Sequence, residues 1–131
     1  KNFVFHLKKI FKKKLIGTNI FDQNLQKKYF HNFDFISINK VLEHIYEPEK
    51  FLNKALNYLK PEGIIYIEVP NAIALKMNGK FSEEFFIEHL HVFSSISLKN
   101  LIIRQKINLI SLKEIKEPSG KFTLFALAKK N

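Results

Sequence analysis

The 131-residue sequence contains no cysteine. Neither a disulfide framework nor a thiolate metal site is therefore possible, which fits a reducing compartment, and we expect a cytoplasmic protein. No apolar run approaches the roughly 20 residues that a membrane helix needs, and the first residues lack the pattern of a signal peptide. We therefore expect no membrane partner.

Glycine is also scarce. The four glycines (Gly17, Gly63, Gly79 and Gly120) are each isolated, and no Gly-x-Gly occurs. Loops that let the backbone approach a cofactor closely need residues without side chains. The sequence therefore contains no glycine-rich cofactor loop.

Arginine is almost absent, because Arg104 is the only one in a chain with a net charge of +10. Recognition of bases and phosphates favours the planar fork of arginine, so we expect no nucleic-acid partner. Lysines within residues 8–14 alternate with apolar residues at helical spacing, which predicts the solvated basic face of a surface helix. The alternative that this face contacts phosphates or lipids remains open.

The residues that are present predict one globular α/β domain, since 46% of them are hydrophobic and 14 are phenylalanine. Apolar runs at 33–38 and 63–69 predict two buried strands. Between them, Pro48 begins a predicted helix that residues 60–63 end, with one apolar face made of Phe51, Leu52, Ala55, Leu56 and Leu59. Such a unit forms a right-handed crossover between parallel strands, and ligands bind at the carboxyl ends of those strands. These ends are residues 39–44 and 70–71.

Several ordered pieces of the sequence match a known family. Phe33-Asp34, Val41-Leu42-Glu43-His44, Leu59-Lys60-Pro61-Glu62-Gly63 and Glu68-Val69-Pro70-Asn71 resemble elements in the second half of the class I S-adenosylmethionine-dependent methyltransferases of the small-molecule type. Residues 88–94 resemble the Glu-His-Leu-His-x-Phe-Ser element that precedes a late helix in many members. The resemblance covers roughly the last three quarters of the chain.

The resemblance implies a Rossmann-like three-layer sandwich with a mostly parallel sheet and a C-terminal antiparallel hairpin. Because the glycine-rich loop after the first strand of that fold has no counterpart, we expect residues 1–131 to be a single methyltransferase-like domain that is incomplete at its N-terminus. The other expected elements are a helix at 2–14, a strand at 15–21, a polar approach at 27–32, a helix at 94–105 and a hairpin of strands 107–115 and 121–128. The apolar residues of 72–86 could line a pocket or belong to the core.

The resemblance also implies S-adenosylmethionine as the cofactor. The residues expected to bind it are Thr18, Asn19 and Asp22, around the end of the strand at 15–21, together with Asn39 and Lys40 at the end of the next strand. An alternative for Asp22 is that its side chain caps a turn.

On the acceptor side, Glu43 and His44 follow the strand at 33–38, and a histidine beside a carboxylate suits proton transfer near neutral pH. His89 and His91 are one residue apart, so on an extended segment they point the same way. We expect Glu43, His44, His89 and His91 to form a catalytic cluster and Asn71 to bind the acceptor. The alternatives are that Glu43 and His44 only begin the next helix and that Asn71 only turns the chain.

Two histidines near Glu43 and His44 also suggest a metal ion. Some relatives hold a divalent ion with a Glu-x-x-Glu-His motif and later histidines. Here Lys40 occupies the position of the first glutamate, so we expect no metal.

The expected function is transfer of a methyl group from S-adenosylmethionine to a small molecule, such as a sugar or polysaccharide precursor. The alternative is a catalytically inactive half-domain that acts as an interaction module. The sequence does not indicate an oligomeric state.

Overall fold

The computed structural model describes residues 19–79 and 88–131. The elements in chain order are α2 (Gln23–Tyr29), β1 (Phe33–Asn39), the 3₁₀ turn η2 (Leu42–His44), α3 (Pro48–Tyr58), β2 (Leu59–Pro70), α4 (Ile73–Asn78), α5 (Ser95–Arg104), β3 (Asn108–Lys116) and β4 (Phe122–Lys129). The helix expected at 2–14 lies outside the described residues. So does most of the strand expected at 15–21, of which residues 19–21 form a turn.

The described strands form one mixed sheet in the order β1-β2-β4-β3. Only β1 and β2 run parallel, and β4 is antiparallel to both β2 and β3. The expectation of a mostly parallel sheet is therefore wrong for these residues, because the C-terminal hairpin supplies two of the four strands. The hairpin itself and the parallel crossover are confirmed.

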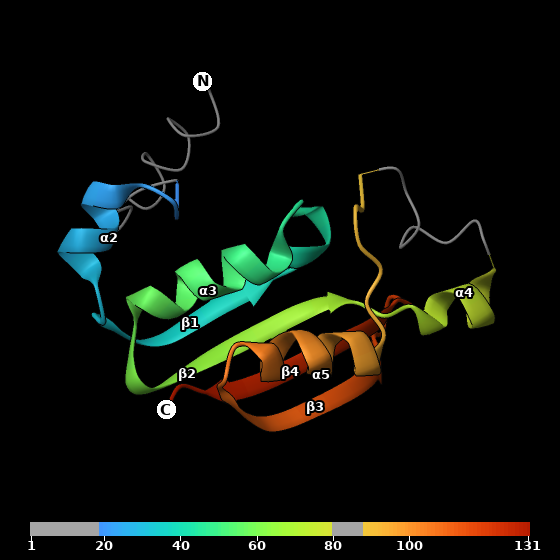
Figure 1. Cartoon of the computed structure of the whole chain (residues 1–131). Coiled ribbons are helices and arrows are strands. Elements are labelled where there is room, and N and C mark those ends of the chain that lie inside the picture. The colour runs from blue at the N-terminus through green and yellow to red at the C-terminus, as the bar shows by residue number, and fades with distance from the viewer. Residues whose placement is uncertain (1–18, 80–87) are drawn as a thin grey trace.

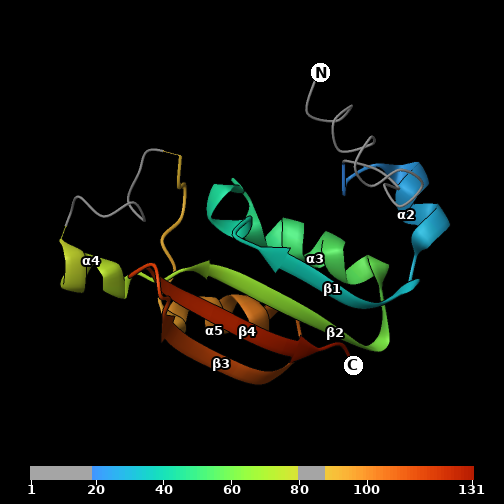
Figure 2. The same cartoon turned by 180° about the vertical axis from the view of Figure 1, so that it is seen from behind.

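Helices α3 and α5 lie against the same face of this sheet (Figures 1 and 2). Their buried residues join the inward residues of β2 and β4 in one core: Leu52, Ala55, Leu56, Leu98, Ile102, Ile65, Ile67, Val69, Leu124, Ala126 and Ala128. On the opposite face, Tyr66 and Phe125 are half-buried and Phe35 is exposed. Among residues 19–79 and 88–131, the layers are thus one sheet and one set of helices rather than the three layers expected.

The crossover helix α3 begins as predicted, with Pro48 in its first turn. It ends earlier, because Leu59 is already the first residue of β2 and is buried there. Gly63 is needed within β2, since a Cβ atom at this position would lie 2.7 Å from Leu59 Cγ and 2.9 Å from the Lys60 carbonyl oxygen. The residues expected to separate helix from strand therefore belong to the strand.

The late helix α5 confirms the prediction, with Ser94 as its N-cap in a capping box with Ser97. Leu98 and Ile102 are buried in the core, whereas Ile96 faces outward and is 72% exposed. The expectation that residues 27–32 form an irregular polar segment before the strand is wrong in part, because residues 23–29 form α2. The first turn of α2 is capped by Asp22, whose side chain accepts hydrogen bonds from the N–H groups of Asn24 and Leu25.

Lys130, just after β4, closes the C-terminal end of α3. Its ammonium donates hydrogen bonds to the carbonyl oxygens of Leu56 (2.7 Å) and Leu59 (2.9 Å) and contacts His31 Nε2 at 2.9 Å. Burial lowers the pKa of Lys130. A cation here satisfies carbonyl groups that the end of the helix leaves without partners.

We predict that Lys130→Met lowers the free energy of unfolding by about 2 kcal/mol, because hydrogen bonds from a charged donor are worth roughly 1.5–3 kcal/mol. Lys129→Met is the matched control, since Lys129 pairs with Glu62 on the surface and exposed ion pairs are worth up to about 1 kcal/mol. Urea denaturation measures both. Equal losses in the two variants would show that Lys130 does not hold α3 in place.

Candidate functional site

The site is built where β1 and β2 end side by side, because Asn39 at the end of β1 pairs in register with Glu68 of β2. Residues 88–93 return to this edge after α4. The His91 N–H donates to the Glu43 carbonyl (3.1 Å), the Ala72 N–H donates to the Phe93 carbonyl (2.7 Å), and Asn71 and Phe93 form a parallel bridge. The backbone therefore fixes the returning segment against both strand ends.

This arrangement brings together three of the four residues predicted to form the catalytic cluster. Glu43 Oε1 lies 3.8 Å from His44 Nε2, and the rings of His44 and His89 meet edge to face with centroids 4.8 Å apart. We call Glu43, His44 and His89 the Glu-His-His cluster. His91 lies beside it, but its Nε2 contacts the Tyr46 carbonyl oxygen at 3.3 Å, so its ring is directed elsewhere.

The hydrogen bonds of His44 define its tautomer. Its Nδ1 lies 3.0 Å from the Glu88 carbonyl oxygen, and because a carbonyl only accepts, Nδ1 carries the proton. In the neutral ring Nε2 then has a free lone pair facing Glu43. The backbone of the returning segment thus orients the imidazole.

Glu43 is the unusual member of the cluster, because it carries a carboxylate and is only 1% exposed to solvent. Its Oε2 has no hydrogen-bond partner among the described residues. Buried polar atoms almost always have partners, since desolvating a carboxylate without compensation is costly. A buried carboxylate oxygen without a partner among the described residues makes Glu43 a candidate for a functional role.

Of the residues predicted to bind the cofactor, Thr18 lies outside the described residues. Asn19 and Asp22 make local bonds: Asn19 Oδ1 accepts from the Phe21 N–H, and Asp22 caps α2. This agrees with the capping alternative for Asp22. Asn39 and Lys40 lie at the end of β1, where Lys40 adopts a φ of 49° and the chain leaves the sheet.

Lys40 belongs to a polar network that sequence reasoning missed. Its Nζ lies 2.9 Å from Glu117 Oε1 and 3.7 Å from Glu68 Oε1, and Thr123 donates its hydroxyl to Glu117. The hydrogen bond from Thr123, followed by that from Lys40, lowers the pKa of Glu117 to about 2. Burial, followed by the hydrogen bond to Glu68, raises the pKa of Tyr66 to about 12. In the sequence, the only sign of this network was the alternation of Tyr66 and Glu68 with apolar residues along β2.

Asn71 is 2% exposed, and both polar atoms of its side chain have partners in the chain. Its Oδ1 accepts from the Ile73 N–H at 3.0 Å, and its Nδ2 donates to Glu114 Oε2 at 3.2 Å. These contacts agree with the alternative that Asn71 turns the chain into α4. An acceptor-binding role stays a prediction.

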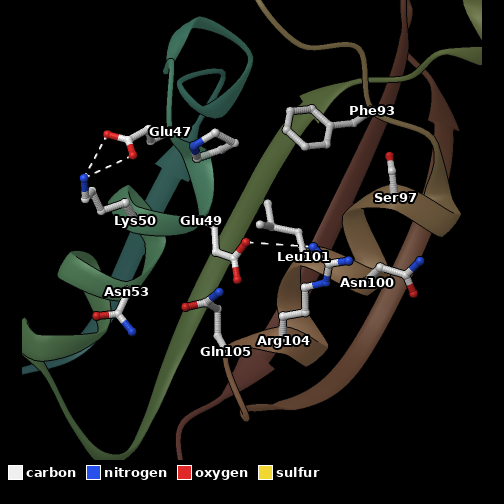
Figure 3. A pocket seen from close by; sticks show the side chains of 11 residues that line it. Glu47, Glu49, Lys50, Asn53, Phe93, Ser97, Asn100, Leu101, Arg104 and Gln105 are labelled. Atoms are coloured by element: carbon white, nitrogen blue, oxygen red, sulfur yellow. Dashed lines mark hydrogen bonds and ion pairs between the residues drawn. The ribbon is translucent and has the colours of Figure 1, made fainter.

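A separate groove of about 840 Å³ lies between α3 and α5 (Figure 3). Phe93 and Leu101 contribute apolar surface, and Glu49 and Arg104 face each other across it at 3.9 Å. None of the three cluster residues lines this groove. Residues 72–86 were expected to line a pocket or join the core, and those from 80 onwards lie outside the described residues. Within 72–79, Ala74 is buried and Leu75 is 50% exposed.

Residues 4–112 match the family described as "Methyltransferase domain". The chain belongs to this family, as its sequence motifs implied. It corresponds to part of a class I methyltransferase domain, in a family that uses S-adenosylmethionine. The sequence matches no curated protein.

Solved methyltransferases share the fold. A methyltransferase from Aquifex aeolicus is 18% identical in sequence. The match has a TM-score of 0.70 and covers 99% of this chain and 63% of the length of the Aquifex protein. The 1,6-didemethyltoxoflavin-N1-methyltransferase of Burkholderia thailandensis, solved with S-adenosylhomocysteine, is 18% identical, with a TM-score of 0.61 over 78% of this chain and 45% of its own. A possible histamine N-methyltransferase from Thermotoga maritima is 16% identical, with a TM-score of 0.60 over 78% of this chain and 58% of its own. The chain thus spans about half to two thirds of these proteins.

The low pKa of Glu117 predicts how stability depends on pH. Because the folded-state pKa of about 2 lies below the unfolded value near 4.5, the carboxylate stabilises the fold above about pH 5 and that stability is lost as the pH falls towards 2. We predict that Glu117→Gln removes up to about 3 kcal/mol of this dependence, at roughly 1.4 kcal/mol per pKa unit.

Thr123→Val should give an intermediate effect, because it removes the largest cause of the shift and keeps the carboxylate. Urea denaturation between pH 2 and pH 7 measures all three proteins. The same acid dependence in the native chain and in Glu117→Gln would contradict the prediction.

Proposed function

We propose that this chain takes part in the transfer of a methyl group from S-adenosylmethionine to a small molecule in the cytoplasm. The observation that carries the proposal is the convergence of Glu43, His44 and His89 at the carboxyl end of β1, in a chain that belongs to a methyltransferase family. Ligands of sheets built from parallel crossovers bind at this edge.

The described residues fit one wall of a cofactor site. Asn39 is exposed at the end of β1 and uses one side-chain N–H in a 3.3 Å bond to Glu68 Oε2, so its amide oxygen can accept a hydrogen bond from a ligand. Asn39 and Lys40 would hold the cofactor from this side. The turn at 19–22 packs on α3, where the Tyr58 hydroxyl donates to the Ile20 carbonyl at 2.9 Å, so cofactor binding by Asn19 and Asp22 stays a prediction. When bound, the cofactor would supply a methyl group on a positively charged sulfur: the acceptor atom bonds to the methyl carbon, and the carbon–sulfur bond breaks to release a neutral thioether.

His44 would serve the acceptor. An acceptor hydroxyl or amine loses a proton as it is methylated, and Nε2 of His44 carries the lone pair that can take it. The Glu88 carbonyl holds the other ring nitrogen in place, and the Glu43 carboxylate, 3.8 Å away, stabilises the imidazolium that forms. His89 packs against the same ring and limits its rotation. Roles of His91 and Asn71 in acceptor binding remain part of this proposal.

A small acceptor is supported by the names of the neighbours in fold. The Burkholderia enzyme is named for N1-methylation of 1,6-didemethyltoxoflavin, and the Thermotoga protein for possible N-methylation of histamine. We include sugars and polysaccharide precursors in the class, because they offer the hydroxyl that His44 would deprotonate.

One observation favours a second candidate function. Because the sequence contains no Gly-x-Gly, the chain could instead be an inactive half-domain that acts as an interaction module. Calorimetric titration of the 131-residue chain with S-adenosylhomocysteine separates the two. Tight binding would exclude the inactive module, and absence of both binding and methyl transfer would overturn the proposed function.

We predict that His44→Ala and His44→Gln lower the rate of methyl transfer by about 10²–10⁴-fold, the usual contribution of a general base. Binding of S-adenosylhomocysteine should be unchanged, because His44 acts on the acceptor. The measurement is transfer of a labelled methyl group to a panel of small hydroxyl and amine compounds.

His31→Gln is the control, since this histidine lies before β1, at the opposite end of the strand, and contacts Lys130. It should transfer methyl groups at the native rate. Full activity in both His44 variants would contradict the role of His44.

A further inference from the structure

The Glu-His-His cluster has the composition and spacing of a metal site. Glu43, His44 and His89 each offer one ligand atom, and these atoms all lie within 4.8 Å of one another. Two imidazole nitrogens and a carboxylate oxygen are ligands that zinc and other divalent transition metals prefer. Small side-chain movements would bring three such atoms to bonding distance of one ion.

The burial of Glu43 is a second observation that favours a bound cation. Its carboxylate is enclosed, Oε2 has no partner among the described residues, and Oε1 is 3.8 Å from His44 Nε2, too far for a hydrogen bond. Lys40 is close in sequence but does not neutralise it, because its ammonium is held by Glu117 and Glu68. A bound cation would compensate the buried charge.

The surroundings also hold the ligands in the form that a metal needs. His44 donates its Nδ1–H to the Glu88 carbonyl, and histidines that bind metals almost always donate their other ring N–H to such an acceptor. This leaves Nε2 on the side of Glu43. The bond from the His91 N–H to the Glu43 carbonyl holds the returning segment, which carries His89, against η2.

We propose that Glu43, His44 and His89 bind one divalent transition metal ion of the Zn²⁺ or Co²⁺ class. The lysine at position 40 was the reason to predict no metal from the sequence. In the structure, however, the Lys40 ammonium lies beside Glu117 and Glu68, and His89 takes the place of a third ligand. With three protein ligands the ion keeps an open position, next to the place proposed for the acceptor.

The proposal does not depend on methyl transfer. It does change the chemistry of His44, because Nε2 cannot hold a metal and accept a proton at once. With the ion bound, an acceptor hydroxyl at the open position would have a lowered pKa and release its proton more readily.

The test uses the native 131-residue chain without a histidine tag, treated with chelator and then titrated with Zn²⁺ and Co²⁺. We expect one ion per chain by calorimetry, visible absorption bands from bound Co²⁺, and a rise in the thermal midpoint, since a ligand of the folded state stabilises it. Glu43→Gln and His89→Ala should each weaken binding more than tenfold.

His91→Ala is the matched control, because it removes the nearest imidazole outside the cluster and should keep the full stoichiometry. Glu43→Gln keeps the shape of the side chain and should be at least as stable as the native chain in chelator, which separates loss of metal from loss of fold. Absence of one-to-one binding, or native affinity in both Glu43→Gln and His89→Ala, would overturn the proposal. These readouts need neither cofactor nor acceptor, so they fail or succeed independently of methyl transfer.

Discussion

The parallel pairing of β1 with β2 is the constraint on which the rest of the site depends. The in-register pairing of Asn39 with Glu68 brings the two strand ends to one edge of the sheet, and α3 covers the joint with Leu52, Ala55 and Leu56. Only because both ends lie together can residues 88–93 bond to Glu43 and to Ala72 at once. The position of His89 relative to His44 is therefore set by strand pairing rather than by local loop preference.

Much of this arrangement could be predicted from the sequence, because its signals are local. Apolar runs, Pro48 and Ser94 specify two strands and two helix starts, and each signal acts within a few residues. The positions of Glu43 and His44 were predictable for a different reason, since residues that follow parallel strands lie at the edge where ligands bind. His89 was singled out through the resemblance of residues 88–94 to a family element. His91 departed from the expectation because its ring found a partner in the Tyr46 carbonyl, and alternation along an extended segment does not take such contacts into account.

The features that could not be predicted arise from pairs far apart in the chain. Lys40 and Glu117 are separated by 77 positions, and their contact exists because β4 returns beside β2 in the antiparallel direction. The same return made the expectation of a mostly parallel sheet wrong. Lys130 likewise reaches the end of α3 because β4, which it follows, lies beside β2. Sequence periodicity reports which face of an element is buried, but not which distant charge will lie opposite it.

The two polar groups at this edge of the sheet differ in a way that bears on function. Glu117 is surrounded by donors, and its low pKa is the result of a carboxylate that the fold has fully compensated. Glu43 is more deeply buried, and its Oε2 has no hydrogen-bond partner among residues 19–79 and 88–131. The fold supplies Lys40 and Thr123 as hydrogen-bond donors to the Glu117 carboxylate, and a comparable donor could have been placed beside Glu43. Proteins retain such unpaired buried groups chiefly where a ligand completes them, so we infer that Glu43 is kept for something that binds at this edge.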